Sequence, residues 1–135
     1  MSKYRKMATR FSSRADLRQA LKAAGVQFEE CRPGQENHLV GYQGDKRPET
    51  ATFIVRRDQI GHASNDLGYH WNGRGFEEVV SDFDSRQEAC TQIRQAVKRE
   101  YAVVTATAAA KAKGFQVKRL DQADGSVQLQ VVGRM

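Results

Sequence analysis

The sequence predicts an α+β domain, in which two or three helices pack on one face of a mainly antiparallel sheet. Segments with helical apolar spacing and segments with strand-like alternation follow one another along the 135 residues. Two of them repeat the order helix, strand, strand on either side of a central set of strands. A chain of this length hides roughly two-thirds of the surface that its unfolded form exposes. We therefore expect a single domain over residues 1–135 with a core of its own.

The first elements are a strand and a helix. Residues 2–11 mix basic and apolar residues with partial alternation, which predicts an edge strand with one solvated face; a disordered basic arm is the alternative. Ser13 and Asp16 then have the spacing of a capping box, in which each side chain satisfies a free backbone N–H of the first turn. The helical apolar spacing is kept by Leu17, Ala20, Leu21 and Ala24. Gly25 is placed to end this helix.

Strands are expected next. Alternation in residues 26–31 and the composition of 38–43, with a Pro-Gly turn between them, predict an antiparallel hairpin. Residues 44–49 (GDKRPE) have the composition of a loop. Residues 50–57 (TATFIVRR) are rich enough in β-formers for a central strand, and 58–65 form another loop.

Residues 66–80 hold the strongest hairpin signal of the chain. Asn72-Gly73 lies between two aromatic-rich runs, and a two-residue type I′ turn needs positive φ at both positions. Such a turn would pair Trp71 with Arg74, and Tyr69 with Phe76, with the aromatic side chains on one face. A cross-strand aromatic pair stabilises a hairpin by roughly 0.2–1 kcal/mol.

A long helical segment follows. Ser85 and Glu88 repeat the capping-box spacing, and helical composition continues from residue 86 to residue 113. The β-branched run 103–105 weakens a helix without forbidding it. We expect two helices with a break near residues 100–104, and one unbroken helix is the alternative.

The C-terminal residues predict a second hairpin and complete a possible internal repeat. Residues 114–120 and 126–132 flank Asp124-Gly125 and alternate as two strands. Residues 20–28 (ALKAAGVQF) and 109–117 (AAKAKGFQV) are identical at five of nine positions, at an offset of 89. Duplication of an α-β-β unit explains this similarity, and so does convergence of helix-Gly-strand units on the same residue types.

The positive charge is concentrated at the N-terminus. The chain has a formal net charge of +6. Residues 1–25 carry seven basic residues against Asp16, whereas residues 26–135 carry fifteen of each sign. The candidates for binding an anion or a nucleic acid are Lys3, Arg5, Lys6, Arg14, Arg18 and Lys22, of which the last three share one helix face. An ordinary solvated helix face is the alternative interpretation.

The aromatic hairpin is the other candidate surface. Its residues Tyr69, Trp71, Arg74 and Phe76 could dock a partner protein or stack on bases. The alternative is that the aromatic side chains pack against a helix in the core.

No constellation of residues supports catalysis or metal binding. The three histidines His38, His62 and His70 have no common spacing, and no nucleophile motif is present. Cys31 and Cys90 are isolated, so we expect reduced thiols and neither a zinc site nor a disulfide. The sequence therefore predicts no enzyme, no cofactor and no metal.

Acidic residues gather after the aromatic hairpin. They are Glu77, Glu78, Asp82, Asp84 and Glu88. We expect a solvated strand end followed by carboxylates at a helix N-terminus, where they are favourable.

The chain has neither an apolar run long enough for a membrane span nor a signal-peptide pattern, which predicts a cytoplasmic protein.

A family resemblance rests on several of these segments. They are MSKYRKMATRF at the N-terminus, the helix with L-x-x-A-L, GYHWNGRGFEEVVSDFD, REYAV, and GFQV followed by DGSVQLQV. Together they resemble the hypothetical chloroplast open reading frame thirty-five family of plastids, cyanobacteria and other bacteria. Gly68–Gly73 is the most specific part, and residues 32–50 and Asp82–Ser85 depart from the typical pattern. The resemblance implies a small domain without an established activity, whose members often accompany AAA-type ATPases.

Two functions follow as expectations. The first is a non-catalytic adaptor or accessory protein that binds another protein through the aromatic hairpin or by strand addition at a sheet edge. An AAA-type ATPase as its partner is implied by the resemblance alone. The alternative is a nucleic-acid-associated protein that uses the basic face of residues 3–22, with weak sequence selectivity and strong salt dependence.

Overall fold

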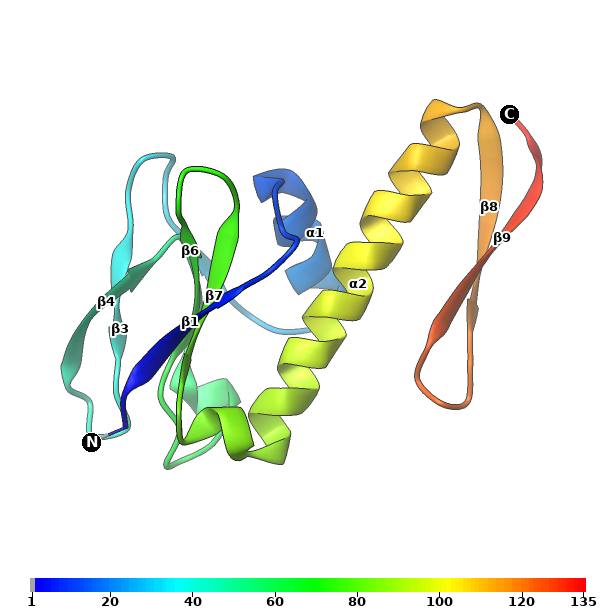
Figure 1. Cartoon of the computed structure of the whole chain (residues 1–135). Coiled ribbons are helices and arrows are strands. Elements are labelled where there is room, and N and C mark those ends of the chain that lie inside the picture. Colours follow the sequence, from blue (N-terminus) through cyan, green and yellow to red (C-terminus); the bar gives the residue numbers. More distant parts are fainter. Residues whose placement is uncertain (1) are drawn as a thin grey trace.

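The computed structural model describes residues 2–135 and confirms the α+β class (Figure 1). The helices are α1 (Arg14–Ala23) and α2 (Glu88–Ala112). The strands are β1 (Tyr4–Ala8), β2 (Glu29–Glu30), β3 (Asn37–Val40), β4 (Lys46–Ala51), β5 (Phe53–Val55), β6 (Leu67–Trp71), β7 (Phe76–Ser81), β8 (Phe115–Asp121) and β9 (Val127–Arg134). The main sheet has the order β1-β7-β6-β5-β2, and all of its pairings are antiparallel.

The main sheet lies between two layers. Its helix-side face packs against α1 and α2, and its other face carries the two-stranded β3–β4 sheet (Figure 1). Alternation along β5 shows the division, because Phe53 and Val55 join the helix-side core while Ile54 packs with Leu39 of β3. A Cβ on Gly68 would approach Ala51 to 2.7 Å, so glycine is needed where the second layer comes closest to the sheet.

The predicted edge strand and the cap of α1 are confirmed. β1 lies at one end of the main sheet, and the Ser13 side chain accepts a hydrogen bond from Asp16 N. Only half of the capping box forms, because the N–H of Ser13 donates to the hydroxyl of Tyr101 at 3.1 Å. A residue of α2 therefore completes the N-terminus of α1. Gly25 follows α1 with a φ of 77°, as its predicted role requires.

The hairpin predicted for residues 26–31 and 38–43 is wrong. β2 pairs with β5, and β3 pairs with β4. The predicted loop 44–49 is also wrong beyond Asp45, because β4 begins at Lys46. Alternation predicts which side chains share a face but not which strand is the neighbour, and long-range contacts decide the pairing here.

The predicted central strand 50–57 is divided. Thr52 separates β4 from β5 and so divides the run between the two sheets. Its N–H donates to Tyr69 O and its carbonyl accepts from Cys31 N. β5 itself lies inside the main sheet, between β6 and β2.

The hairpin predicted at Asn72-Gly73 is present, but its turn and register differ. Four residues, 72–75, connect β6 and β7, and Trp71 is opposite Phe76. Tyr69 is opposite Glu78, so both predicted cross-strand pairs are wrong. The type I′ turn is absent because Gly73 alone of the four has a positive φ. The carbonyl of Phe11 accepts the N–H of Phe76 at 2.7 Å, which ties the end of the loop to the chain before α1.

α2 is one helix of 25 residues, so the predicted break near residues 100–104 is wrong. Glu100 and Tyr101 are both buried at that point. The Tyr101 ring lies 4.5 Å from that of Phe11, and these tertiary contacts outweigh the small propensity cost of β-branched residues. The second capping box is also wrong, since Gln87 is the N-cap and the Ser85 hydroxyl donates to Asp82 O.

The predicted C-terminal hairpin is confirmed as β8–β9, which stands apart from the main sheet beside the second half of α2 (Figure 1). We call residues 102–135 the C-terminal arm. Within this stretch no residue is fully buried, and Tyr101 is the last buried residue of the chain. The two units of the sequence repeat therefore differ: strands β8 and β9 pair with each other, whereas β2 and β3 do not.

Candidate functional site

β1 presents an open backbone edge. Among residues 2–135 it has β7 on one side and no strand on the other. Asp82 N donates to Lys3 O, which places Lys3, and every second residue after it, in the hydrogen-bonded positions of the β1–β7 pair. The N–H and C=O groups of Lys6 and Ala8 therefore point away from β7, toward the open edge.

A groove runs beside this edge. It has a volume of about 1120 Å³ and lies between α2 and the chain from Met7 to Ser12. Met7, Ala8 and Phe11 line it from one side, and Arg94, Lys98 and Tyr101 line it from α2. A smaller pocket of about 200 Å³, at the turn of the β6–β7 hairpin, shares the segment Ala8–Ser12 with it. The open edge of β1 thus continues into a hollow of about 1120 Å³.

An ion pair between Glu78 and Arg94, extended by a hydrogen bond from Tyr69, lies at the groove. Glu78 is 7% exposed and accepts hydrogen bonds from Arg94 Nε at 2.6 Å and from the Tyr69 hydroxyl at 3.1 Å. Burial raises the pKa of Tyr69 well above its usual value, and the Glu78 carboxylate raises it further. Arg94 also reaches Met7 Sδ at 3.3 Å. Glu78, Arg94 and Tyr69 therefore satisfy one another's polar groups and contribute to the shape of the groove.

The expectation that the acidic segment is solvated is wrong for two residues. Glu78 is buried as described, and Asp84 is 1% exposed. The Asp84 carboxylate accepts from Asn65 N at 2.8 Å and from the Ser81 hydroxyl at 2.6 Å. The sequence prediction failed because it did not identify the donors that compensate for burying these carboxylates.

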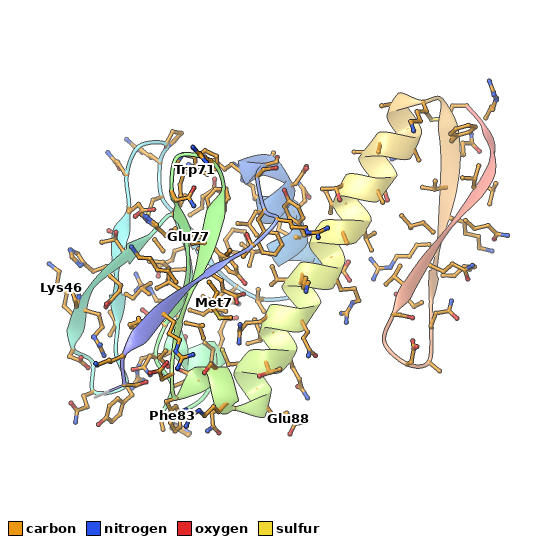
Figure 2. All side chains as sticks on the ribbon, in the orientation of Figure 1. Met7, Lys46, Trp71, Glu77, Phe83 and Glu88 are labelled. Atoms are coloured by element: carbon orange, nitrogen blue, oxygen red, sulfur yellow. The ribbon has the colours of Figure 1, made fainter. Side chains whose placement is uncertain are left out.

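The four aromatic-hairpin candidates separate into two pairs. Tyr69 and Phe76 are core residues on the helix side of the sheet. Trp71 is 42% exposed, and Figure 2 shows it near the turn of the β6–β7 hairpin. Its ring meets Phe76 edge-on at 5.0 Å. Arg74 is exposed and lines the small pocket. Only Trp71 and Arg74 are therefore accessible to a partner.

Much of the predicted basic face is engaged in ion pairs. Arg14 and Arg18 share a helix face, and both bind Glu30 of β2, with Nε to carboxylate distances of 2.8 and 2.6 Å. The hydrogen bond from Arg18 is the main cause that lowers the pKa of Glu30. Arg5 pairs with Asp82. No ion pair is found for Lys3, Lys6 or Lys22 within residues 2–135.

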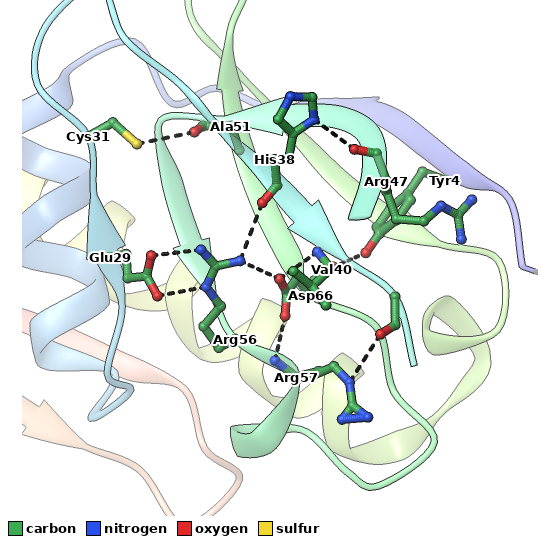
Figure 3. A network of polar contacts seen from close by, with 11 residues as sticks. Tyr4, Glu29, Cys31, His38, Val40, Arg47, Ala51, Arg56, Arg57 and Asp66 are labelled. Carbon is green, nitrogen blue, oxygen red and sulfur yellow. Dashed lines mark hydrogen bonds and ion pairs between the residues drawn. The ribbon is translucent and has the colours of Figure 1, made fainter. Parts of the chain in front are cut away.

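Asp66 is the centre of another polar network (Figure 3). Its buried carboxylate accepts from Arg56 Nη1 at 2.6 Å and from the N–H groups of Val40 and Arg57, each at 2.7 Å. Arg56 also binds both carboxylate oxygens of Glu29. The network joins β2 and β3 to the residues that follow β5 and precede β6, so we interpret it as stabilising the fold.

Two histidines are held by hydrogen bonds. His70 Nδ1 lies 2.7 Å from Glu36, which also accepts from the hydroxyls of Thr50 and Thr52. Burial by itself raises the pKa of Glu36, but these hydrogen bonds outweigh it and lower the pKa. His38 Nδ1 lies 2.7 Å from the carbonyl of Arg47. In the described part of the chain, no three residues of metal-binding type come together.

Sequence reasoning missed the α2 wall of the groove. Arg94, Lys98 and Tyr101 follow one another at helical spacing, i, i+4 and i+7, and so share one face. That spacing is visible in the sequence, but it indicates a groove wall only once β1 is known to lie opposite α2.

No helix in residues 2–135 is both long enough and apolar enough to cross a bilayer.

Comparison with known proteins gives one finding. A family model described as "Protein of unknown function (DUF1257)" matches residues 20–130. The matched range includes α2 and most of the C-terminal arm, but not β1. No curated protein and no solved structure matches the chain.

Proposed function

Because the chain belongs to the DUF1257 family, whose function is unknown, we propose a role from its own geometry. The protein is a non-catalytic adaptor that binds an extended segment of another protein by strand addition to β1. One observation carries this proposal: the open backbone edge of β1 lies directly beside a groove that can receive side chains.

Strand addition would use groups that β1 already presents. Lys6 and Ala8 offer donors and acceptors in the direction of the missing neighbour. Met7, on the intervening position, is 41% exposed at the groove and gives an apolar contact for a side chain of the added strand. Charged residues such as Lys6 protect an edge against indiscriminate pairing, which suits an edge that selects its partner.

The alternative of nucleic-acid binding has less support. Arg5 is paired with Asp82, and Arg14 and Arg18 share Glu30, so two of these three positive charges are compensated within the chain. Three lysines of the predicted face remain, and neutralising fewer phosphates weakens the salt-dependent attraction to a nucleic acid. Catalysis also has no positive support in the geometry of the groove.

We also propose the kind of partner and the location of the protein. The resemblance to the hypothetical chloroplast open reading frame thirty-five family favours an AAA-type ATPase as the partner. A cytoplasmic location fits the two cysteines, which are both free thiols; Cys90 is buried, and burial raises its pKa to about 12.

The proposal is tested by blocking the edge of β1 without changing its charge. Ala8→Pro removes an outward N–H, whereas the matched control Ala8→Val keeps it. Affinity purification, with and without nuclease, compares the proteins captured by the two variants and by the wild-type chain. We expect Ala8→Val to retain the partners of the wild type and Ala8→Pro to lose them, irrespective of nuclease. Equal capture by both variants would contradict strand addition at β1.

A second surface is tested in the same way. Trp71→Ala removes the exposed aromatic ring near the β6–β7 turn and leaves β1 unchanged. If Trp71→Ala loses the partners and Ala8→Pro keeps them, the hairpin is the docking surface and the groove is not.

A further inference from the structure

We infer that the segment bound along β1 is acidic. The inference rests on the proposed strand addition and adds the chemistry of the partner, which neither the open edge nor the family specifies. It is carried by the charges that surround the groove and the edge.

The cations around the groove exceed the anions. Its lining contains Arg10, Arg94 and Lys98 against Asp16 and Glu78. Arg94 and Glu78 neutralise each other at 2.6 Å, which leaves two cations and one anion. Lys6 adds a further cation on β1 itself. Among residues 2–135, no ion pair is found for Lys6, Arg10 or Lys98.

The free cations lie on both faces of the strand that would be added. Met7 faces the helix side, since its sulfur contacts Arg94 of α2. Tyr4 packs on the opposite side, against the β3–β4 layer, so Lys6 faces that side as well. Lys98 and Arg10 flank the groove on the helix side. Carboxylates on either face of an added strand would therefore meet an unpaired cation.

The other edge of the same sheet gives the opposite pattern. β2 carries Glu29 and Glu30, and both carboxylates are held by arginines of this chain. Pairing of β1 with the β2 edge of a second copy would have to compete with those arginines for the carboxylates. A separate acidic segment meets no such competition, so we favour a different protein as the occupant.

The test uses short fluorescent peptides and the full chain. In the first peptide glutamate alternates with threonine and valine, and in two matched peptides glutamine or lysine replaces glutamate. A short oligothymidylate tests for unspecific attraction of a polyanion. Fluorescence anisotropy gives the affinity of each probe for the wild type, Ala8→Val, Ala8→Pro, and the double variant Arg10→Gln with Lys98→Gln.

We expect the acidic peptide to bind about tenfold more tightly than the glutamine peptide, and the lysine peptide to bind least. The double variant should lower affinity for the acidic peptide by about tenfold and leave the glutamine peptide unchanged. Ala8→Pro should abolish binding of all peptides. An acidic peptide with N-methyl groups on alternate amides should also fail to bind the wild type, which tests the edge even if Ala8→Pro does not fold.

The two proposals fail in different ways. If the acidic and glutamine peptides bind equally and Ala8→Pro or N-methylation abolishes both, the charge inference is overturned and strand addition stands. If Ala8→Pro and the N-methylated peptide bind as well as their controls, strand addition is overturned and the inference falls with it. Tighter binding of oligothymidylate than of the acidic peptide, insensitive to Ala8→Pro, would overturn both proposals in favour of nucleic acid.

Discussion

The two halves of α2 lie in different surroundings. Its first half contributes Cys90, Val97 and Tyr101 to the core beneath the main sheet. Its second half belongs to the C-terminal arm, where residues 102–135 include no fully buried residue. Apolar burial is the largest favourable term in folding, so the main body can be stable through its core. The apolar side chains of the arm are at most half-buried, so the arm depends more on local hydrogen bonds, on helix propensity and on its attachment to the body.

One well-defined ion pair joins the arm to the main body. Arg119 of β8 donates to both oxygens of Glu100, at 2.6 and 2.8 Å. Glu100 is 2% exposed, whereas the Arg119 side chain is 37% exposed. The pair therefore joins the edge of the core to the second half of β8. Removing this ion pair should therefore destabilise the arm and leave the main body unchanged.

The largest expected effect is in the body. Leu21→Ala removes a fully buried side chain that packs in the helix-side core, and such a truncation costs about 2–5 kcal/mol of unfolding free energy. Val132→Ala, at a side chain of the arm that is 53% exposed, should change the unfolding free energy by less than about 0.5 kcal/mol. Chemical denaturation measures both. Similar losses in the two variants would show that the arm has a core of its own.

A smaller effect is expected from the attachment. Glu100→Gln keeps the size of the side chain and removes its charge, which leaves Arg119 paired with the exposed Asp121 alone; because Arg119 is partly solvated, we expect a loss of about 1–2 kcal/mol. Hydrogen exchange should then increase in β8 and β9 and stay unchanged in β5 to β7. Asp121→Asn is the matched control, because Asp121 is exposed and binds the same arginine. Equal exchange in both variants would exclude Glu100 as the attachment.

The same pair predicts a pH dependence. The hydrogen bond from Arg119 is the main cause that lowers the pKa of Glu100 in the folded chain. The stabilisation is therefore complete above the ordinary carboxyl pKa, and it is lost as pH falls through the lowered value. Proteolysis of the arm should accelerate below about pH 4.5 in the wild type. In Glu100→Gln it should already be fast at neutral pH and change less on acidification.

The next effect is local to the arm. Gly114 ends α2 with a φ of 84°, and a Cβ there would meet no atom within 4 Å. Gly114→Ala should therefore cost about 1 kcal/mol through backbone strain alone. Gly133→Ala is the control, since Gly133 has no positive φ and equally open surroundings. Hydrogen exchange of the amides in β8 and β9 compares the two variants and should be faster in Gly114→Ala. Equal exchange rates in the two variants would contradict a strained backbone at position 114.

The smallest expected effect concerns the exposed strand β9. Val131→Lys places a charge at a side chain that is 57% exposed, so the unfolding free energy should change by less than about 0.5 kcal/mol. Thermal unfolding measures it. A loss of more than about 1 kcal/mol would show that Val131 is covered and that the arm resembles the body after all.

Local patterns in the sequence predicted local structure well. Ser13, Leu17 and Gly25 define α1 through contacts within a few residues, and Asp124-Gly125 defines the turn of β8–β9. Prediction failed where a distant residue decides the structure. Tyr101 keeps α2 continuous through its contact with Phe11, which is 90 positions away in the chain.

The candidate site shows the same limit. The basic character of residues 3–22 was visible in the sequence, but Arg14 and Arg18 are bound to Glu30, which no local spacing indicates. The groove joins two segments that are far apart, one ending at Ser12 and one beginning at Thr91. Lys98 acquires its proposed role only because β1 lies opposite. The residue types of one element therefore showed where basic side chains are available. Which of them remain without an ion pair depends on how the elements pack together.

The unbroken course of α2 gives the protein a mechanical property. At about 1.5 Å per residue, its 25 residues form a rod of about 38 Å. Residues between Thr91 and Thr105 of this rod line the groove, and its C-terminal end leads into β8 and β9. A force that tilts the outer end would turn the rod about its contact with Phe11 and change the width of the groove. Because the rod has no break at residues 100–104, a displacement of β8 and β9 would be transmitted along α2 to the wall of the groove.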